Sequence, residues 1–174
     1  MDWLNRIFDK LLALFPQIWI CPPDEAGVLI TFGKFVSSKG AGWYLFWPII
    51  QTIVRMEIKT QVTDLRNQSV RTKDGYSLVV SGAVQYYITD IKKAALDVQD
   101  LDRSLITLAL GIIFEFVRQR TLDECYNVKE LKVEILKGLR DAARGWGIKI
   151  EQVYITDLDR ARNIRLLTNS IVTS

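Results

Sequence analysis

Few residues of this chain could do chemistry, and their spacing favours structural roles. Ser37, Ser38 and Lys39 are consecutive, whereas a Ser/Lys nucleophile pair needs its base held in a fixed geometry beside the hydroxyl. Neighbouring residues in a loop of small side chains do not hold that geometry. The sequence contains no histidine, which excludes His-based triads, histidine general bases and histidine metal ligands.

Two carboxylate pairs also stand close together in the sequence, Asp157 with Asp159 and Asp123 with Glu124. Neither pair has the partners that acid–base catalysis requires, so helix caps or solvated charges explain them better. Thr121 precedes Glu124 by three residues, which is the spacing of a capping box at the start of a helix.

The remaining candidates are a glycine turn and two cysteines. Gly40-Ala41-Gly42 begins a phosphate-binding fingerprint, but the third glycine is missing and aromatic residues follow where a helix would be needed. Cys21 and Cys125 are far apart and cannot form a metal site alone. Cys125 lies in an apolar helical stretch and is expected to be an inert core residue. We therefore expect no enzyme activity, no cofactor and no metal site.

Composition bounds the remaining function classes. The chain has 174 residues, of which 49% are hydrophobic and 25% are charged, enough for one domain with a sizeable core. The net charge is +3, and it is spread evenly: 9 Lys/Arg against 7 Asp/Glu in residues 1–87, and 14 against 13 in residues 88–174. Because no basic stripe emerges, we expect no nucleic-acid partner.

The N-terminal segment, residues 1–23, is strongly apolar. Spacings of three and four predict an amphipathic helix. Arg6, Asp9 and Lys10 are too polar for the whole segment to span a bilayer, and Pro16 would kink it. We expect a helix that lies in the membrane interface or dips into it. Its expected contact residues are Trp3, Leu4, Ile7, Phe8, Leu11, Leu12, Phe15, Ile18 and Trp19.

Two alternatives stay open for this segment. The apolar stripe also suits a core helix of a soluble domain, although two tryptophans near its ends favour a water–lipid boundary. Cys21 follows the stripe and is a candidate for reversible acylation, while a buried or idle thiol is an equally good reading. Pro22-Pro23 is expected to end the helix.

After the prolines the pattern changes to strands and then to helices, which predicts an α+β fold. The expected organisation is an N-terminal membrane-associated segment (1–23), a domain over 24–158, and a short C-terminal helix start or tail (159–174). The expected strands cover 26–36, 52–64, 76–89 and 148–158, and the expected helices cover 91–98, 102–119 and 128–144.

The run from Trp43 to Ile50 is apolar or aromatic at every position and follows a glycine turn. An exposed run of this kind indicates a membrane or protein contact. A buried strand or corner explains the run equally well, because short apolar runs are ambiguous.

Several pieces of the chain together resemble the stomatin/prohibitin/flotillin superfamily, whose shared unit is the SPFH or band-7 domain. The likeness is greatest to stomatin-like proteins and covers nearly all of residues 24–158. Each piece is weak alone, but their order and spacing are specific. The pieces are GVLITFGKF (27–35), GAGWYLFWPIIQTIVRMEIKT (40–60), RTKDGYSLVVSGAVQYYITD (71–90), RQRTL (118–122) and RGWGIKIEQVYITDL (144–158).

The resemblance implies an antiparallel sheet followed by helices packed on a second small sheet. It also implies a non-enzymatic scaffold at the cytoplasmic face of a membrane, contacting lipid and organising membrane proteases, channels or lipid microdomains. The N-terminal element would be the anchor, and the matching tip of the first sub-domain would add Trp43, Tyr44, Phe46 and Trp47 as contacts.

The resemblance further implies self-association, as a homo-oligomer or with related SPFH proteins. Family members usually continue into a long coiled coil, for which 159–174 leaves no room, so we expect smaller assemblies or assembly with a longer relative. A different hypothesis also fits the sequence. In it, the chain is a soluble regulatory module whose N-terminal helix docks on a protein partner.

Overall fold

The N-terminal lobe is built from five strands, arranged as a two-stranded ribbon and a three-stranded sheet. Both are antiparallel: β1 pairs with β4 in the ribbon, and β2 lies between β3 and β5 in the sheet. The strands are β1 (Gln17–Cys21), β2 (Glu25–Thr31), β3 (Phe35–Lys39), β4 (Gly42–Phe46) and β5 (Gln51–Glu57).

The C-terminal lobe is a second antiparallel sheet covered on one face by helices. β7 is its central strand, flanked by β6 and β8. The computed structural model describes residues 15–160. The elements of this lobe are β6 (Gln61–Arg71), β7 (Ser77–Ile88), α2 (Ile91–Leu96), α3 (Leu101–Arg118), α4 (Leu122–Tyr126), α5 (Val128–Ala142) and β8 (Ile148–Arg160).

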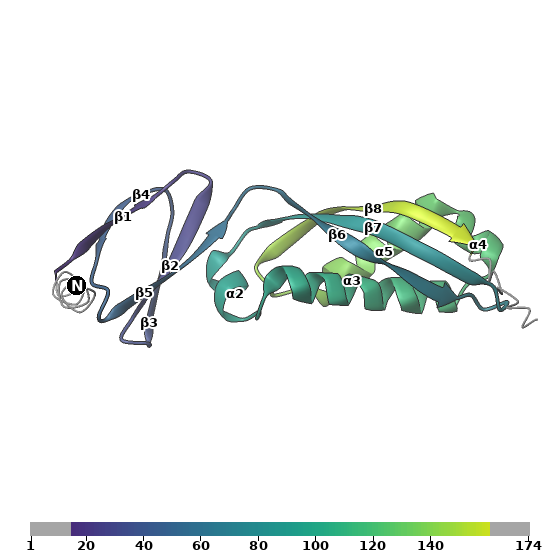
Figure 1. Ribbon diagram of the computed structural model, residues 1–174, viewed down its shortest axis with the longest axis horizontal. Helices are drawn as coiled ribbons and strands as arrows, with labels where there is room; N and C mark the ends of the chain where they lie inside the picture. The colour runs from purple at the N-terminus through teal and green to yellow at the C-terminus, as the bar shows by residue number, and fades with distance from the viewer. Residues whose placement is uncertain (1–14, 161–174) are drawn as a thin grey trace, which may run out of the picture.

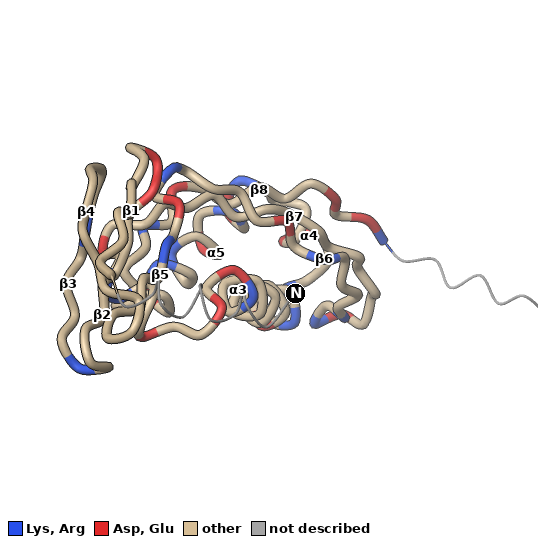
Figure 2. Tube along the Cα trace, turned by 60° about the vertical axis from the view of Figure 1, so that its left-hand side comes forward, with Lys and Arg blue, Asp and Glu red and all other residues tan. Residues whose placement is uncertain are grey.

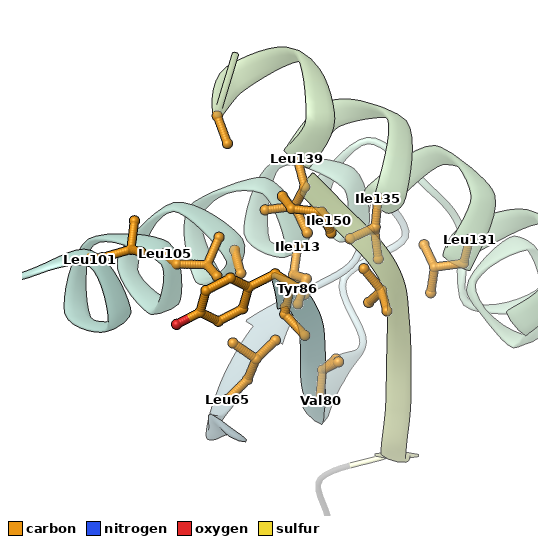
Figure 3. Close-up of a cluster of buried hydrophobic side chains, with 14 of the residues drawn as sticks. Leu65, Val80, Tyr86, Leu101, Leu105, Ile113, Leu131, Ile135, Leu139 and Ile150 are labelled. Carbon is orange, nitrogen blue, oxygen red and sulfur yellow. The ribbon is translucent and has the colours of Figure 1, made fainter. Parts of the chain in front are cut away.

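The main core lies between this second sheet and the helices α3 and α5. Every second residue of β7 points into it, and both helices contribute residues at spacings of four. Figure 3 shows these side chains converging from the strands and from both helices. The core residues that it labels are Leu65, Val80, Tyr86, Leu101, Leu105, Ile113, Leu131, Ile135, Leu139 and Ile150.

The two lobes follow one another along an elongated molecule, with the N-terminal lobe at one end and the helices toward the other (Figure 1). α2 lies at the junction, where it contacts β2, β3 and β5. The Lys59 ammonium group pairs with the Asp24 carboxylate at 2.8 Å. The Tyr86 hydroxyl donates to the Asp102 carboxylate, and it lies 3.0 Å from the side-chain oxygen of Gln61, the first residue of β6 after the junction. The contacts of α2 join the two lobes, whereas the Tyr86 bonds tie β6, β7 and α3 together within the C-terminal lobe, beside the junction.

The α+β class is confirmed, and so are the central strand β7 and the helices α3 and α5. The helix predicted up to Cys21 is wrong for Gln17–Cys21, which form β1 and pair with β4. The domain start predicted at residue 24 therefore falls inside the strand system. The expected contacts before residue 15 and most of the predicted tail (161–174) lie outside the described residues.

Two predicted strands are each divided in the structure. The stretch 26–36 is split by a turn at Phe32–Lys34, so Gly33 lies where the chain reverses between β2 and β3. The stretch 52–64 is split at 58–60, where β5 leaves the first lobe and β6 enters the second. The first break folds one apolar stretch into two paired strands of the same sheet, and the second divides a stretch between two different sheets.

Candidate functional site

The exposed apolar side chains of the molecule are concentrated at one end. Between residues 15 and 160, fifteen large hydrophobic side chains are exposed, and nine of them lie within residues 15–49. Soluble domains rarely collect so much apolar surface in one place without a contact to make there. These nine are Phe15, Ile18, Ile20, Phe32, Phe35, Trp43, Leu45, Trp47 and Ile49.

Part of this surface is one face of the β1–β4 ribbon. Ile18 is paired with Leu45, and Ile20 with Trp43, so four exposed apolar side chains form two neighbouring cross-strand pairs. Alternation along a strand sends successive side chains to opposite faces. The ribbon therefore has one face turned to the outside and one turned to the sheet beneath it.

The inward face of the ribbon is held by Trp19. Its side chain is 3% exposed, and the centre of its ring lies 5.5 Å from the centre of the Tyr44 ring. The guanidinium group of Arg55, which belongs to β5 of the neighbouring sheet, lies 5.4 Å from the centre of the indole. Gly27 of β2 makes room for it, because a Cβ there would come within 2.2 Å of the indole. The membrane contact predicted for Trp19 is therefore corrected: its ring joins the ribbon to the sheet.

Cys21 is also turned inward. Its thiol is buried and donates to the Glu25 carbonyl oxygen at 3.4 Å. Burial raises the pKa of this thiol, with the nearby Glu25 charge adding to the effect. Acylation needs an accessible thiol with thiolate character. The fold thus favours the buried-thiol reading of Cys21 over the acylation reading.

The second part of the apolar surface, which we call the tip, is formed where three chain segments meet at one end of the lobe. The tip comprises Phe15 before β1, the Phe32–Phe35 turn between β2 and β3, and the Trp47–Ile49 connection between β4 and β5. The register shows that these segments share one end, since Thr31 pairs with both Phe35 and Gln51. At the same end, Gln17 pairs with Phe46.

Gln51 fixes the arrangement of the tip. Its side-chain oxygen accepts from the Trp47 backbone N–H at 2.8 Å, and its side-chain nitrogen donates to the Thr31 hydroxyl at 3.2 Å. The Phe32 backbone N–H also donates to the Ile50 carbonyl oxygen at 2.8 Å. These bonds hold the two connections beside each other while their large side chains stay exposed.

The membrane-contact residues predicted from the sequence thus differ in their exposure in the structure. Phe15, Ile18, Trp43 and Trp47 are exposed on the apolar end. Tyr44 and Phe46 are half-buried on the inward side of β4. Trp3, Leu4, Ile7, Phe8, Leu11 and Leu12 lie outside the described residues.

The sequence reading missed Phe32 and Phe35. Their exposure follows from the turn between them, which the stretch from Ala26 to Val36 hides when it is taken as one strand. The signal was Phe-Gly-Lys-Phe itself: a glycine followed by a charge inside an apolar strand pattern is typical of a turn.

The charge around this end is sparse and of one sign. Between Ala26 and Val54 the only charged residues are Lys34 and Lys39. Figure 2 shows the strands of the N-terminal lobe as largely uncharged, in contrast to the mixed charges elsewhere. An apolar surface with a few cationic groups and no acidic residue between residues 26 and 54 suits contact with lipid head groups.

Polar clusters elsewhere in the described part of the chain support the fold. Thr121 and Glu124 form the predicted capping box of α4. Asp74 accepts from the Thr72 hydroxyl and from the Leu122 backbone N–H, bonds that lower the pKa of its carboxyl. Within residues 15–160 no group of His, Cys, Asp and Glu side chains could hold a metal ion. In the same range, no helix has the length and apolar character needed to cross a bilayer.

Comparison with known proteins identifies relatives of this sequence among the stomatins and in archaea. The sequence is 26% identical to mouse (Mus musculus) stomatin over 159 residues, and 27% identical over 150 residues to a stomatin homolog of Pyrococcus horikoshii. These matches cover 87% and 86% of this chain, and 56% of either relative's length. A protein of Methanocaldococcus jannaschii is 27% identical over 94% of this chain and 82% of its own length.

The family match covers both lobes. The profile described as SPFH domain / Band 7 family matches residues 20–166. That range includes most of the apolar end, the junction at α2, and the sheet and helices of the C-terminal lobe. The chain therefore belongs to the SPFH domain / Band 7 family, and its likeness within that family is to the stomatins.

Proposed function

We propose that this protein is a non-enzymatic, stomatin-like scaffold that attaches to a membrane through the apolar end of its N-terminal lobe. The observation that carries the proposal is the gathering of nine of the fifteen exposed large hydrophobic side chains at that end. The tip includes Phe15, and the ribbon begins with β1 at Gln17, so both parts of this surface follow residues 1–14 closely in the sequence.

The free energy available from this surface is large enough to matter. Full burial of a large apolar side chain contributes about 1.5–3 kcal/mol. Immersing about half of five tip side chains would give on the order of 5 kcal/mol, which corresponds to weak and reversible attachment. The apolar residues of 1–14 would add to this, and interfacial segments commonly attach through two such contributions.

The scaffold part of the proposal concerns partners. Attachment by one end of an elongated molecule would leave the helical lobe facing the aqueous side, which we propose is the cytoplasm. That lobe is the surface we propose for self-association, for assembly with related SPFH proteins, and for contact with a membrane protease or channel. Family membership and the separation of the two ends of the molecule support this assignment (Figure 1).

Vesicle flotation of the full chain tests the attachment. Phe35 and Val133 are matched for exposure, at 65% and 67%, but they lie in the tip and on α5 respectively. Phe35→Asp is expected to lower the floated fraction about tenfold, because it replaces an immersed phenyl ring with a charge. Val133→Asp is expected to leave flotation unchanged.

Phe8→Asp tests the contribution of residues 1–14 in the same experiment. It is expected to weaken flotation while the circular dichroism spectrum of the domain stays intact. Equal flotation of Phe35→Asp and Val133→Asp would contradict attachment through the tip. Failure of the wild-type chain to float at all would reject membrane attachment and favour a soluble module that docks on a protein partner.

A further inference from the structure

The turn between β2 and β3 presents a lysine between two exposed phenylalanines. Phe32, Lys34 and Phe35 are all exposed, and a Cβ on Gly33 would meet no atom within 4 Å. The Lys34 backbone N–H donates to the Thr31 carbonyl oxygen at 3.1 Å, which closes the turn. The backbone of the turn is therefore held in place while its side chains project outward.

Phe32 adopts a backbone conformation that phenylalanine rarely adopts. Its φ is 51°, in the left-handed region, and its side chain is 68% exposed. A bulky residue is uncommon in this region, and such outliers gather at functional positions. Since the ring packs little against its own lobe, a contact with a partner outside the molecule best explains why a phenylalanine stands at this position.

Lys34 carries a charge that makes no ion pair within residues 15–160. The ion pairs found among residues 15–160 join Lys59 to Asp24, Lys93 to Asp90, Arg120 to Glu134 and Arg144 to Asp141. None involves Lys34. Lys39, the other cation of this region, lies at the far end of β3 with its ammonium group 5.3 Å from the Tyr44 ring. Within the described part of the chain, the turn thus presents a cation that has no ion-pair partner, placed between two apolar rings.

We propose that this turn recognises anionic phospholipid, with Phe32 and Phe35 at the acyl boundary and the Lys34 ammonium group at lipid phosphates and carboxylates. Lysine readily places its charge at the head-group level while its stem stays among apolar groups. Charge complementarity selects an anionic bilayer surface as the occupant, because one exposed lysine offers too few donors to hold a free phosphate. This inference rests on the proposed membrane attachment and adds a lipid class to it.

Flotation of the full chain on two kinds of vesicle tests the inference. The vesicles are phosphatidylcholine alone and phosphatidylcholine with about 30% phosphatidylserine, which gives a negative surface potential. Lys34→Gln is expected to lower partitioning onto the anionic vesicles about fivefold and to leave partitioning onto phosphatidylcholine nearly unchanged. Lys34→Arg keeps the charge and should retain wild-type partitioning.

Lys39→Gln is the matched control, since it removes the same charge about 16 Å further along β3. It is expected to change partitioning much less than Lys34→Gln, because charge effects fade over a Debye length of about 8 Å. Equal losses for the two variants would overturn the inference and indicate a response to net charge. Equal wild-type binding to both vesicles would also overturn it, yet would leave membrane attachment intact. No binding to either vesicle would reject the proposed attachment itself.

Discussion

At the scale of single residues, Phe32 shows a conflict between folding and the proposed contact. A left-handed backbone conformation costs an L-residue about 1–2 kcal/mol. Because the phenyl ring of Phe32 is exposed, its packing within the folded chain offsets little of this cost. Its neighbour Gly33, at φ 65°, occupies the same region without such a penalty. The protein with phenylalanine at position 32 is therefore expected to be less stable than one with glycine or asparagine, which adopt this region more readily.

Phe32→Asn is expected to have opposite effects on stability and on attachment. Asparagine tolerates the left-handed region, so the free energy of unfolding should rise by about 0.5–1 kcal/mol. Loss of the exposed ring should lower flotation on phosphatidylcholine vesicles. Urea unfolding and flotation measure the two effects. A variant that is less stable than wild type would show that the ring contributes to folding, contrary to this account.

At the scale of elements, the N-terminal lobe depends on how the ribbon sits on the sheet. Trp19 is the main link between them, and it occupies the space left by Gly27. A side chain at position 27 would displace the indole and with it the whole inner face of β1. Gly27 is thus required by a close approach between two layers.

Gly27→Ala is expected to destabilise the protein by about 1–3 kcal/mol, the usual effect of overpacking a core. Gly40→Ala is the matched control, because a Cβ there meets nothing within 4 Å. Thermal unfolding followed by tryptophan fluorescence should show an early loss for Gly27→Ala only. If the two variants unfold alike, the Trp19 contact does not hold the ribbon in place.

The same elements show what could be read from the sequence. Strand β7 and helices α3 and α5 were predictable, because each repeats its apolar residues with the period of its own structure. β1 was not predictable, because its outward and inward residues are apolar alike. Ile18 and Ile20 face outward while Trp19 and Cys21 face inward, so the alternation has no trace in hydropathy.

For a related reason, the sequence shows an aromatic run after Gly42 but not which of its side chains face outward. Composition identified Trp43 and Trp47, but it could not distinguish them from their inward neighbours Tyr44 and Phe46. That assignment depends on the pairing of β4 with β1, and a helical prediction for Gln17–Cys21 leaves no strand for β4 to pair with. A single error in one element therefore carried over to the face of its partner strand.

At the scale of the whole molecule, the elongated shape and the proposed attachment by one end together predict how the molecule is oriented relative to the bilayer. The seven residues of β5 alone span about 23 Å between the tip and the lobe junction. Trp47 lies in the tip, whereas Trp146 lies between α5 and β8 in the C-terminal lobe. An attached molecule should therefore keep these two indoles at different depths.

Quenching of tryptophan fluorescence by brominated lipids measures this orientation. Trp47→Phe is expected to remove much of the quenchable emission, while the phenyl ring preserves attachment. Trp146→Phe is expected to remove emission that the lipids do not quench. Should Trp146 account for the quenched share instead, the molecule would lie along the bilayer, and attachment by one end would be wrong.

The position of β1 directly after residues 1–14 affects the strength of the proposed attachment. β1 is fixed in the lobe by its pairing with β4, and it begins at Gln17. Two weak lipid contacts would thus be joined with almost no linker between them. Once either had partitioned, the other would face the bilayer at a high effective concentration, and the second step would become intramolecular. Attachment would then behave as avidity, in which weakening either contact lowers the affinity of the whole molecule for the bilayer.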